Sequence, residues 1–344
     1  MAVSPAPKVR DFRGLNSVLF QARSSLLERA FFRFLVLLET PSDPCAPSSP
    51  FLRFQAQGMK TILIQLDTDP LPSTFDRVVA VDAEVDHLFS YGGVTPEVVE
   101  PLVHGAMFTR GPKDLKSTAI FIGGSNVAAG ENLLAKVQKV FFGPVRVSVL
   151  MDSNGSNTTA AAAVLSARKH LTLAGCDAVV LAGTGPVGQR AAQILASEGA
   201  RVRVASRAVE RAQQTCEAIR QTLPQAQVLP VSAGTSSETK SACEGAALVI
   251  AAGAAGVELL SAETRSQLEA LRVAIDLNAV PPAGIAGVEV FDKGTDRGGV
   301  VCYGAIGVGG LKMKIHKGAI RRLFESNDVV LDTAAIYQLG LGLV

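Results

Sequence analysis

The fold of this chain is decided by the stretch Ala178-Val179-Val180-Leu181-Ala182-Gly183-Thr184-Gly185-Pro186-Val187-Gly188. It begins with an apolar run that suits a buried parallel strand and continues with glycines in the spacing GxGxxG, before a helix-like segment at residues 189–197. In this context the first glycine permits a tight turn, the second lets backbone approach a pyrophosphate, and the third lets helix and strand pack closely. We therefore predict a dinucleotide site that includes Gly183, Thr184, Gly185, Pro186, Val187 and Gly188.

The end of the next predicted strand, residues 201–205, favours NADP over NAD. Ser206 and Arg207 follow that strand, 18 residues after Gly188, where a protein that prefers NAD would place Asp or Glu for the ribose 2′-hydroxyl. A hydroxyl beside a guanidinium suits a 2′-phosphate, because Arg forms charge-assisted bonds with phosphate oxygens. The predicted cofactor is NADP, with NAD used more weakly. The alternative is a solvent-facing Ser-Arg pair at the start of the next helix.

Two later loops are expected to border the nicotinamide. They contain the small residues 253–256 and the segment 276–282, and each follows a predicted strand. In doubly wound sheets, ligands bind outside the carboxyl ends of the strands. This adds Ala252, Gly253 and Asn278 to the predicted cofactor residues, although a tight structural turn explains the first loop equally well.

From Met59 onward, β-rich runs alternate with helix-like segments, as in βαβ units with a mainly parallel sheet. In the first half we expect strands near residues 62–66, 119–123 and 145–151, and helices near 96–104 and 128–139. The predicted fold is α/β with two domains, a smaller N-terminal α/β domain at residues 59–156 and a Rossmann-type NADP-binding domain with a parallel sheet at residues 157–325. A C-terminal helix at residues 326–344 is expected to pack back towards the N-terminal domain.

Residues 1–58 do not share this pattern. They have no sustained period of two or of 3.6 residues, and their Pro/Ser-rich part at 41–50 cannot continue a helix. We expect either that translation starts at Met59, which makes residues 1–58 a non-native extension, or that residues 1–58 form a disordered extension.

The composition excludes several classes of protein. Hydrophobic residues make up 48% of the 344 and charged residues 19%, which is too apolar for a disordered chain, and the net charge of +2 gives no support for binding nucleic acid or an anionic membrane. No run approaches the roughly 18–20 apolar residues of a membrane span, so a cytoplasmic protein is expected. The five cysteines lack metal-ligand spacing, and no metal site is predicted.

Further motifs extend over most of the chain: QLDTD at 65–69, PSTFD at 72–76, STAIFIGG at 117–124, DSNGSNTT at 152–159, NAVPP at 278–282 and GAIGVGGLKMK at 304–314. With the stretch at 181–188, they make Met59 to Val344 closely resemble the NADP-dependent methylene-tetrahydromethanopterin dehydrogenases of methylotrophic bacteria, some of which also accept methylene-tetrahydrofolate. The resemblance implies hydride transfer from the methylene bridge of 5,10-methylene-tetrahydromethanopterin to NADP, in one-carbon (formaldehyde) oxidation. It also implies a homo-oligomer, with a trimer as the expected form.

The resemblance further implies the residues of the substrate site. Phe75 is expected to pack on the pterin, Asn157 and Thr159 to reach its polar atoms, and Asp69 to be a further pterin ligand. Lys312 is expected at the mouth of the cleft, as the catalytic candidate. A cation beside a developing cation would disfavour the transition state, so Lys312 is expected to orient the substrate through hydrogen bonds.

Other interpretations of these residues stay open from the sequence alone. Phe75 could pack in the core, the polar run 152–159 could be mainly a helix N-cap, and Lys312 could lie on a solvated helix face. The substrate could instead be methylene-tetrahydrofolate or another small molecule, such as a shikimate-type keto acid. A sensor that binds NADP and a pterin without turnover is the interpretation from a different functional class.

Overall fold

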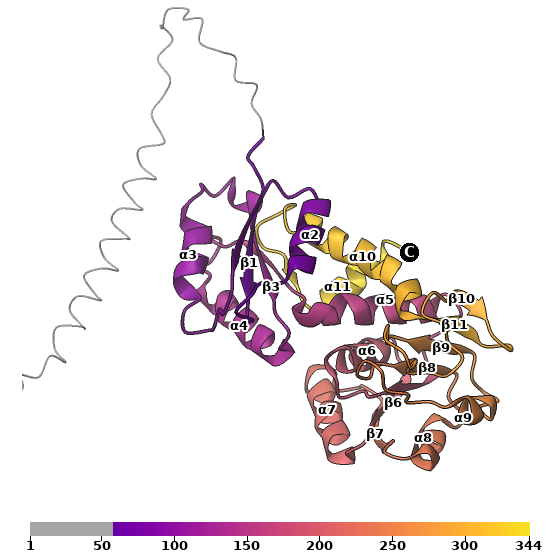
Figure 1. The fold of residues 1–344 in the computed structure, drawn as a ribbon. Helices are drawn as coiled ribbons and strands as arrows, with labels where there is room; N and C mark the ends of the chain where they lie inside the picture. Colours follow the sequence, from indigo (N-terminus) through magenta and orange to yellow (C-terminus); the bar gives the residue numbers. More distant parts are fainter. Residues whose placement is uncertain (1–57) are drawn as a thin grey trace, which may run out of the picture. The chain divides into compact units, whose positions relative to one another are not determined.

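The computed structural model describes residues 58–344, which form two mainly parallel sheets with helices packed on them (Figure 1). The prediction for residues 1–58 lies outside this range, apart from Gly58. The predicted α/β architecture with a Rossmann-type sheet is confirmed. The boundaries predicted for the domains stay a prediction.

The first sheet has five strands in the order β12-β4-β3-β1-β2, and all its pairs are parallel. Its strands are β1 (Ile62–Asp67), β2 (His87–Tyr91), β3 (Thr118–Gly123), β4 (Ser148–Met151) and β12 (Val330–Leu331). The helices between these strands are α2 (Thr74–Asp82), α3 (Glu100–Phe108) and α4 (Val127–Val140). Because β12 comes from the far end of the chain, the C-terminal segment completes the first sheet.

Helix α3 and strand β4 begin later than the sequence predicts. The helix expected at residues 96–104 spans Glu100–Phe108, with Pro101 in its first turn. Proline is tolerated there because an N–H in the first turn has no partner within the helix. The strand expected at residues 145–151 is limited to Ser148–Met151, because Val145 pairs back with Phe142 in an isolated bridge.

The second sheet has seven strands in the order β10-β11-β9-β8-β5-β6-β7, and β10 is its one antiparallel strand. Its strands are β5 (Asp177–Leu181), β6 (Arg201–Ser206), β7 (Val228–Ser232), β8 (Leu248–Ala251), β9 (Val273–Asp276), β10 (Lys293–Asp296) and β11 (Val301–Tyr303). The helices that accompany it are α6 (Pro186–Ser197), α7 (Val209–Thr222), α8 (Ser236–Cys243) and α9 (Ala262–Ser266). The strand order reverses beside β5, and this is where such sheets bind ligands.

Three helices pack together between the sheets: α5 (Ser156–Arg168), α10 (Ala305–Arg322) and α11 (Thr333–Leu341) (Figure 1). Helix α5 contacts α6, α10 and α11, and its residues 160–167 are all buried. Close packing depends on small residues here, since a Cβ on Gly340 would lie 2.6 Å from Leu165 Cδ1. Within residues 58–344, no helix combines the length and apolar character needed to cross a membrane.

Candidate functional site

A cavity of about 670 Å³ opens at the carboxyl ends of β5, β6 and β8. Its walls come from the turn after β5, from the start of α7 and from the loop after β8. They include eight of the predicted cofactor residues: Thr184, Gly185, Pro186, Val187, Ser206, Arg207, Ala252 and Gly253. The position and the lining fit an extended dinucleotide at the carboxyl edge of the sheet.

Gly183 and Gly188 lie behind this cavity, where they allow the turn to pack closely. A Cβ on Gly183 would lie 2.8 Å from Val204 Cγ1, and one on Gly188 would lie 2.8 Å from the carbonyl oxygen of Ala182. Either contact is too short for a real side chain. These two glycines therefore shape the turn, while Gly185 faces the cavity.

The first turn of α6 can receive an anion. Gly185 is its N-cap and Pro186 its first residue, and no side chain caps the helix. Its first amide groups therefore remain open, and the helix dipole favours negative charge at this end. Gln189 supports the turn by donating from Nε2 to the carbonyl oxygen of Thr184 at 2.7 Å. This geometry fits a pyrophosphate.

Arg211 and Thr239 also line the cavity, and neither was predicted from the sequence. Arg211 lies four residues after Arg207, in the first turn of α7, so a second arginine shortly after the Ser-Arg pair could have indicated it. Both arginines are exposed, and neither forms an ion pair within the described part of the chain. No carboxylate lines the cavity among the described residues. The edge of the cavity therefore suits a phosphate group.

Asn278 lies outside this cavity. Its side chain holds the loop after β9, donating to the carbonyl oxygen of Pro282 at 2.9 Å and accepting from the N–H of Val280 at 2.9 Å. In the structure, the side chain of Asn278 therefore stabilises its own loop.

A second group of residues lies around the ammonium of Lys312 on α10. This Lys312 group consists of Lys312, Phe75, Asp76, Asp152, Gly155 and Thr159. The Nζ of Lys312 lies 4.4 Å from the centroid of the Phe75 ring, and Phe75 is half-exposed on α2. Within residues 58–344, Lys312 forms no hydrogen bond or ion pair with another side chain. Burial lowers the pKa of this lysine, against the attraction of Asp152 and Asp76. A largely buried ammonium without a direct partner is typical of a binding site.

Gly155 makes room for this ammonium. It precedes α5 with a φ of +57°, and a Cβ there would lie 3.1 Å from Lys312 Nζ and 3.9 Å from Thr159 Oγ1. A side chain at this position would both strain the backbone and crowd the lysine. Thr159, predicted from the sequence, therefore lies on the same side of Gly155 as Lys312.

Two carboxyl groups that the sequence interpretation missed accompany the lysine. Burial raises the pKa of Asp76 to about 6 and that of Asp152 to about 6. Asp152 is fully buried and accepts hydrogen bonds from the hydroxyl of Thr158 at 2.6 Å and the N–H of Asn157 at 2.9 Å. Both acids lie in motifs already singled out, PSTFD at 72–76 and DSNGSNTT at 152–159, and their place in these motifs was the available signal.

Asn157 and Asp69 are occupied by contacts within the protein. Asn157 is buried, donates to the carbonyl oxygen of Met151 at 2.7 Å and accepts from the hydroxyl of Thr333 at 2.7 Å. Asp69 accepts from both the N–H and the hydroxyl of Ser125 at 2.9 Å. These contacts fix the N-terminal end of α5 and join the loops after β1 and β3.

His316 lies one helical turn after Lys312 and supports Phe75 from behind. Its ring stacks on Phe121 with centroids 5.7 Å apart and lies 6.3 Å from the Phe75 ring. Burial, followed by repulsion from Lys312, lowers the pKa of His316 to about 3, so the ring is neutral near pH 7.

The two groups of residues meet at one turn. Asn154 lines the cavity at the second sheet, and the next residue, Gly155, borders Lys312 and Thr159. Asn154 has a φ of +56°, so two successive residues adopt the left-handed conformation here. The turn therefore places the cavity and the Lys312 group next to each other.

Comparison with known proteins matches two family models to this chain. Residues 74–154 match "Methylene-tetrahydromethanopterin dehydrogenase, N-terminal", and residues 171–284 match "Putative NAD(P)-binding". The first range contains Phe75, Asp76 and Asp152, and the second contains the glycine-rich turn.

Two curated relatives from Methylorubrum extorquens match most of the chain. "Bifunctional protein MdtA" is 45% identical over 283 residues, which cover 82% of this chain and 98% of that protein. "NAD(P)-dependent methylenetetrahydromethanopterin dehydrogenase" is 36% identical over 290 residues, which cover 78% of this chain and 94% of that protein. Among solved structures, quinate dehydrogenase from Corynebacterium glutamicum in complex with NAD matches at a TM-score of 0.48 and 14% identity, over 82% of this chain and 99% of that one.

Asp152→Asn should change how the free energy of unfolding depends on pH. Asparagine can keep the bonds with Asn157 and Thr158, so the substitution removes mainly the charge. Because the pKa of Asp152 is raised from 3.8 to about 6, the folded chain holds a proton that the unfolded chain has released, and stability falls as pH rises between these values. As pH rises across this range, we expect the free energy of unfolding of the variant to increase by about 1–3 kcal/mol relative to that of the native chain. Urea unfolding at each pH measures this difference.

The control is Asp82→Asn, the same substitution at an exposed position on α2, which should leave the pH dependence unchanged. Parallel pH profiles for the native chain and Asp152→Asn would contradict the expectation.

Proposed function

Because this chain belongs to the methylene-tetrahydromethanopterin dehydrogenase family, whose members are oxidoreductases that use NAD(P), we propose that it transfers hydride from the methylene bridge of 5,10-methylene-tetrahydromethanopterin to NADP. The product is the methenyl form, and the reaction belongs to one-carbon oxidation. The proposal includes a homo-oligomeric, trimeric protein in the cytoplasm.

The observation that carries this proposal is the shared turn at Asn154 and Gly155. A hydride can pass only between atoms in contact, so the two binding sites of such an enzyme must adjoin. Asn154 borders the cofactor cavity and Gly155 borders the Lys312 group. A substrate bound against Phe75, Thr159 and Lys312 would therefore lie next to the cofactor.

The choice of NADP rests on the cavity around Ser206. Arg207 and Arg211 are exposed at its edge, and the described lining contains no carboxylate to receive a ribose 2′-hydroxyl. Two guanidinium groups suit a 2′-phosphate. Thr184, Gly185, Pro186 and Val187 would hold the pyrophosphate at the first turn of α6, with Ala252 and Gly253 bordering the nicotinamide, which accepts the hydride when bound.

The protein needs no general base for this reaction. Loss of hydride breaks one C–H bond with its electron pair, and the resulting methenyl cation is stabilised by its own two nitrogens. The residues of the chain therefore have to position the methylene carbon and restrict water. In this proposal Phe75 supports the pterin by stacking, and Thr159 donates to its polar edge.

Lys312 orients the substrate through hydrogen bonds. Its ammonium is held above Phe75 and has three donors for acceptor atoms of a ligand. Asp76 and Asp152 offset its charge, so the site as a whole does not oppose the cation that forms. Asn157 and Asp69 act in this proposal by fixing the backbone around the substrate.

Purified protein should form reduced cofactor from methylene-tetrahydromethanopterin and NADP. The assay compares this substrate with methylene-tetrahydrofolate, each with NADP and with NAD, and follows absorbance of the reduced nicotinamide. Turnover that is fastest with the methanopterin form and NADP is the expected result. Binding of NADP without turnover of either pterin would overturn the proposed function and favour a sensor.

Arg207→Asp should change the cofactor preference. The substitution replaces attraction for a 2′-phosphate with repulsion, so we expect KM for NADP to rise about 10- to 100-fold and KM for NAD to change little. Lys169→Asp makes the same charge change at the exposed end of α5 and should leave both values unchanged. An unaltered ratio of the two KM values in Arg207→Asp would move phosphate recognition elsewhere.

Lys312→Met should lower kcat/KM for the pterin about 10- to 100-fold, the effect of losing one or two charge-assisted hydrogen bonds. The Kd for NADP should stay the same, because the lysine belongs to the substrate side of the turn. Lys314→Met, an exposed change on the same helix, serves as the control. A variant with normal kcat/KM would remove Lys312 from the site.

A further inference from the structure

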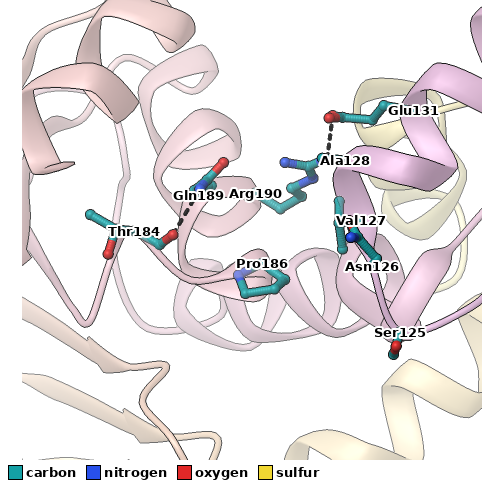
Figure 2. Close-up of a pocket in the computed structure, with 9 residues that line it drawn as sticks. All are labelled: Ser125, Asn126, Val127, Ala128, Glu131, Thr184, Pro186, Gln189 and Arg190. Carbon is teal, nitrogen blue, oxygen red and sulfur yellow. Dashed lines mark hydrogen bonds and ion pairs between the residues drawn. The ribbon is translucent and has the colours of Figure 1, made fainter.

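A second cavity, of about 440 Å³, separates the first turns of α4 and α6 (Figure 2). On one side it is lined by Ser125 and the start of α4, and on the other by Thr184, Pro186 and the start of α6. The two helices belong to different sheets. At this cavity, a helix of the first sheet faces a helix of the second sheet.

One ion pair spans this space, between Arg190 of α6 and Glu131 of α4 (Figure 2). Within residues 58–344, it is the one ion pair that joins a helix of the first sheet, among α2–α4, to a helix of the second, among α6–α9. The more extensive contacts between the layers pass through α5, α10 and α11. The pair is thus a direct link across the cavity.

The burial of the two partners is unequal. The Arg190 side chain is 7% exposed and that of Glu131 is 53% exposed. A buried guanidinium is unfavourable unless a carboxylate or several acceptors compensate it, and Arg190 Nε has no partner among the described residues. An apolar side chain would fill the same place on α6 without this cost, so packing alone does not explain an arginine here.

Each partner of the pair is close to a loop of its own sheet, and both line the cavity between α4 and α6. Arg190 follows Gln189, whose side chain braces the glycine-rich turn at Thr184. On the opposite side, Glu131 lies on the helix that begins after Ser125, and Ser125 holds the Asp69 loop of the first sheet. A change in the separation of α4 and α6 would therefore change the separation of cofactor and substrate.

We propose that Arg190 and Glu131 are positioning residues that set the distance across which hydride is transferred. This inference rests on the proposed function. The cofactor is held by the second sheet, and the pterin by α2, α10 and the start of α5. Transfer requires the two reacting carbons in contact, and a displacement of about 1 Å can slow such a step about 100-fold. In this proposal the ion pair holds α4 and α6 at the separation that transfer requires.

The test uses two single variants of the full chain, Glu131→Met and Arg190→Met, and the exchanged pair Glu131→Arg with Arg190→Glu. Each single variant should slow hydride transfer about 10- to 100-fold in single turnovers, with a larger primary deuterium isotope effect on the observed rate. The Kd for NADP should stay nearly unchanged. The exchanged pair should recover most of the rate, because it restores opposite charges on α4 and α6. A loss of stability alone would not raise the isotope effect.

Glu131→Met leaves the buried charge of Arg190 without a partner, so this variant alone could lose activity by unfolding. Arg190→Met removes the buried charge and therefore serves as the second test. Glu100→Met is the matched control, since it breaks the ion pair with Lys136 within the first sheet's helices and should leave the rate unchanged. Hydrogen–deuterium exchange adds a readout that needs no turnover. Residues 125–131 and 184–190 should exchange faster in both single variants and return to native rates in the exchanged pair.

Native single-turnover rates and native exchange in both single variants would overturn the inference, as would a slowed rate that the exchanged pair fails to restore. A failure of the proposed function shows itself differently, as absence of turnover in the unmodified chain. In that case hydrogen–deuterium exchange still decides whether the ion pair between Arg190 and Glu131 holds α4 against α6.

Discussion

The rest of the structure depends on burying helix α5 on all sides. Side chains 160–167 are inaccessible, and α6, α10 and α11 all pack against this one helix. Helices can approach a common neighbour this closely only if its side chains are small, which explains the run of four alanines at 160–163. A larger residue in this run would push apart helices that belong to different sheets. The alanines therefore fix how the helices of the two sheets pack around α5.

A helix buried to its first residue must satisfy its own N-terminal amide groups. Asp152 does so for Asn157 and Thr158, and this places a carboxylate where no water can solvate it. Its raised pKa is the consequence of that burial. Lys312, one helix away, gains a counter-charge without a direct ion pair, so its donors remain available to a ligand. One structural need, capping α5, thus creates the electrostatics of the candidate site.

Local patterns predict the parts of this protein that local chemistry determines. The strand, the GxGxxG turn and the helix at 178–197 were predicted from residues adjacent in sequence, and Thr184, Gly185, Pro186 and Val187 line the cavity. Arg211 was missed because it lies in α7, after the Ser-Arg pair at the end of the strand. Asp76 was missed because its burial near Lys312 comes from the packing of α2 against α10. The internal bonds of Asn278 and Asn157 depend on partners, such as Thr333, that only the folded chain brings near. Pairing of β12 with β4 is equally non-local and has no signal in two residues.

Charge in the Lys312 group also explains why a lysine is compatible with the proposed reaction. Positive charge develops on the methenyl bridge, and an isolated ammonium nearby would oppose it more strongly as the medium becomes less polar. Asp76 and Asp152 lie in the same environment, and attraction to both counters the effect of burial on the lysine. Neutral His316 adds no further positive charge. In the proposed function the group therefore holds a polar substrate by directed hydrogen bonds while remaining close to neutral towards the cation that forms. This leaves the rate to depend on distance, which in our proposal the ion pair between α4 and α6 sets.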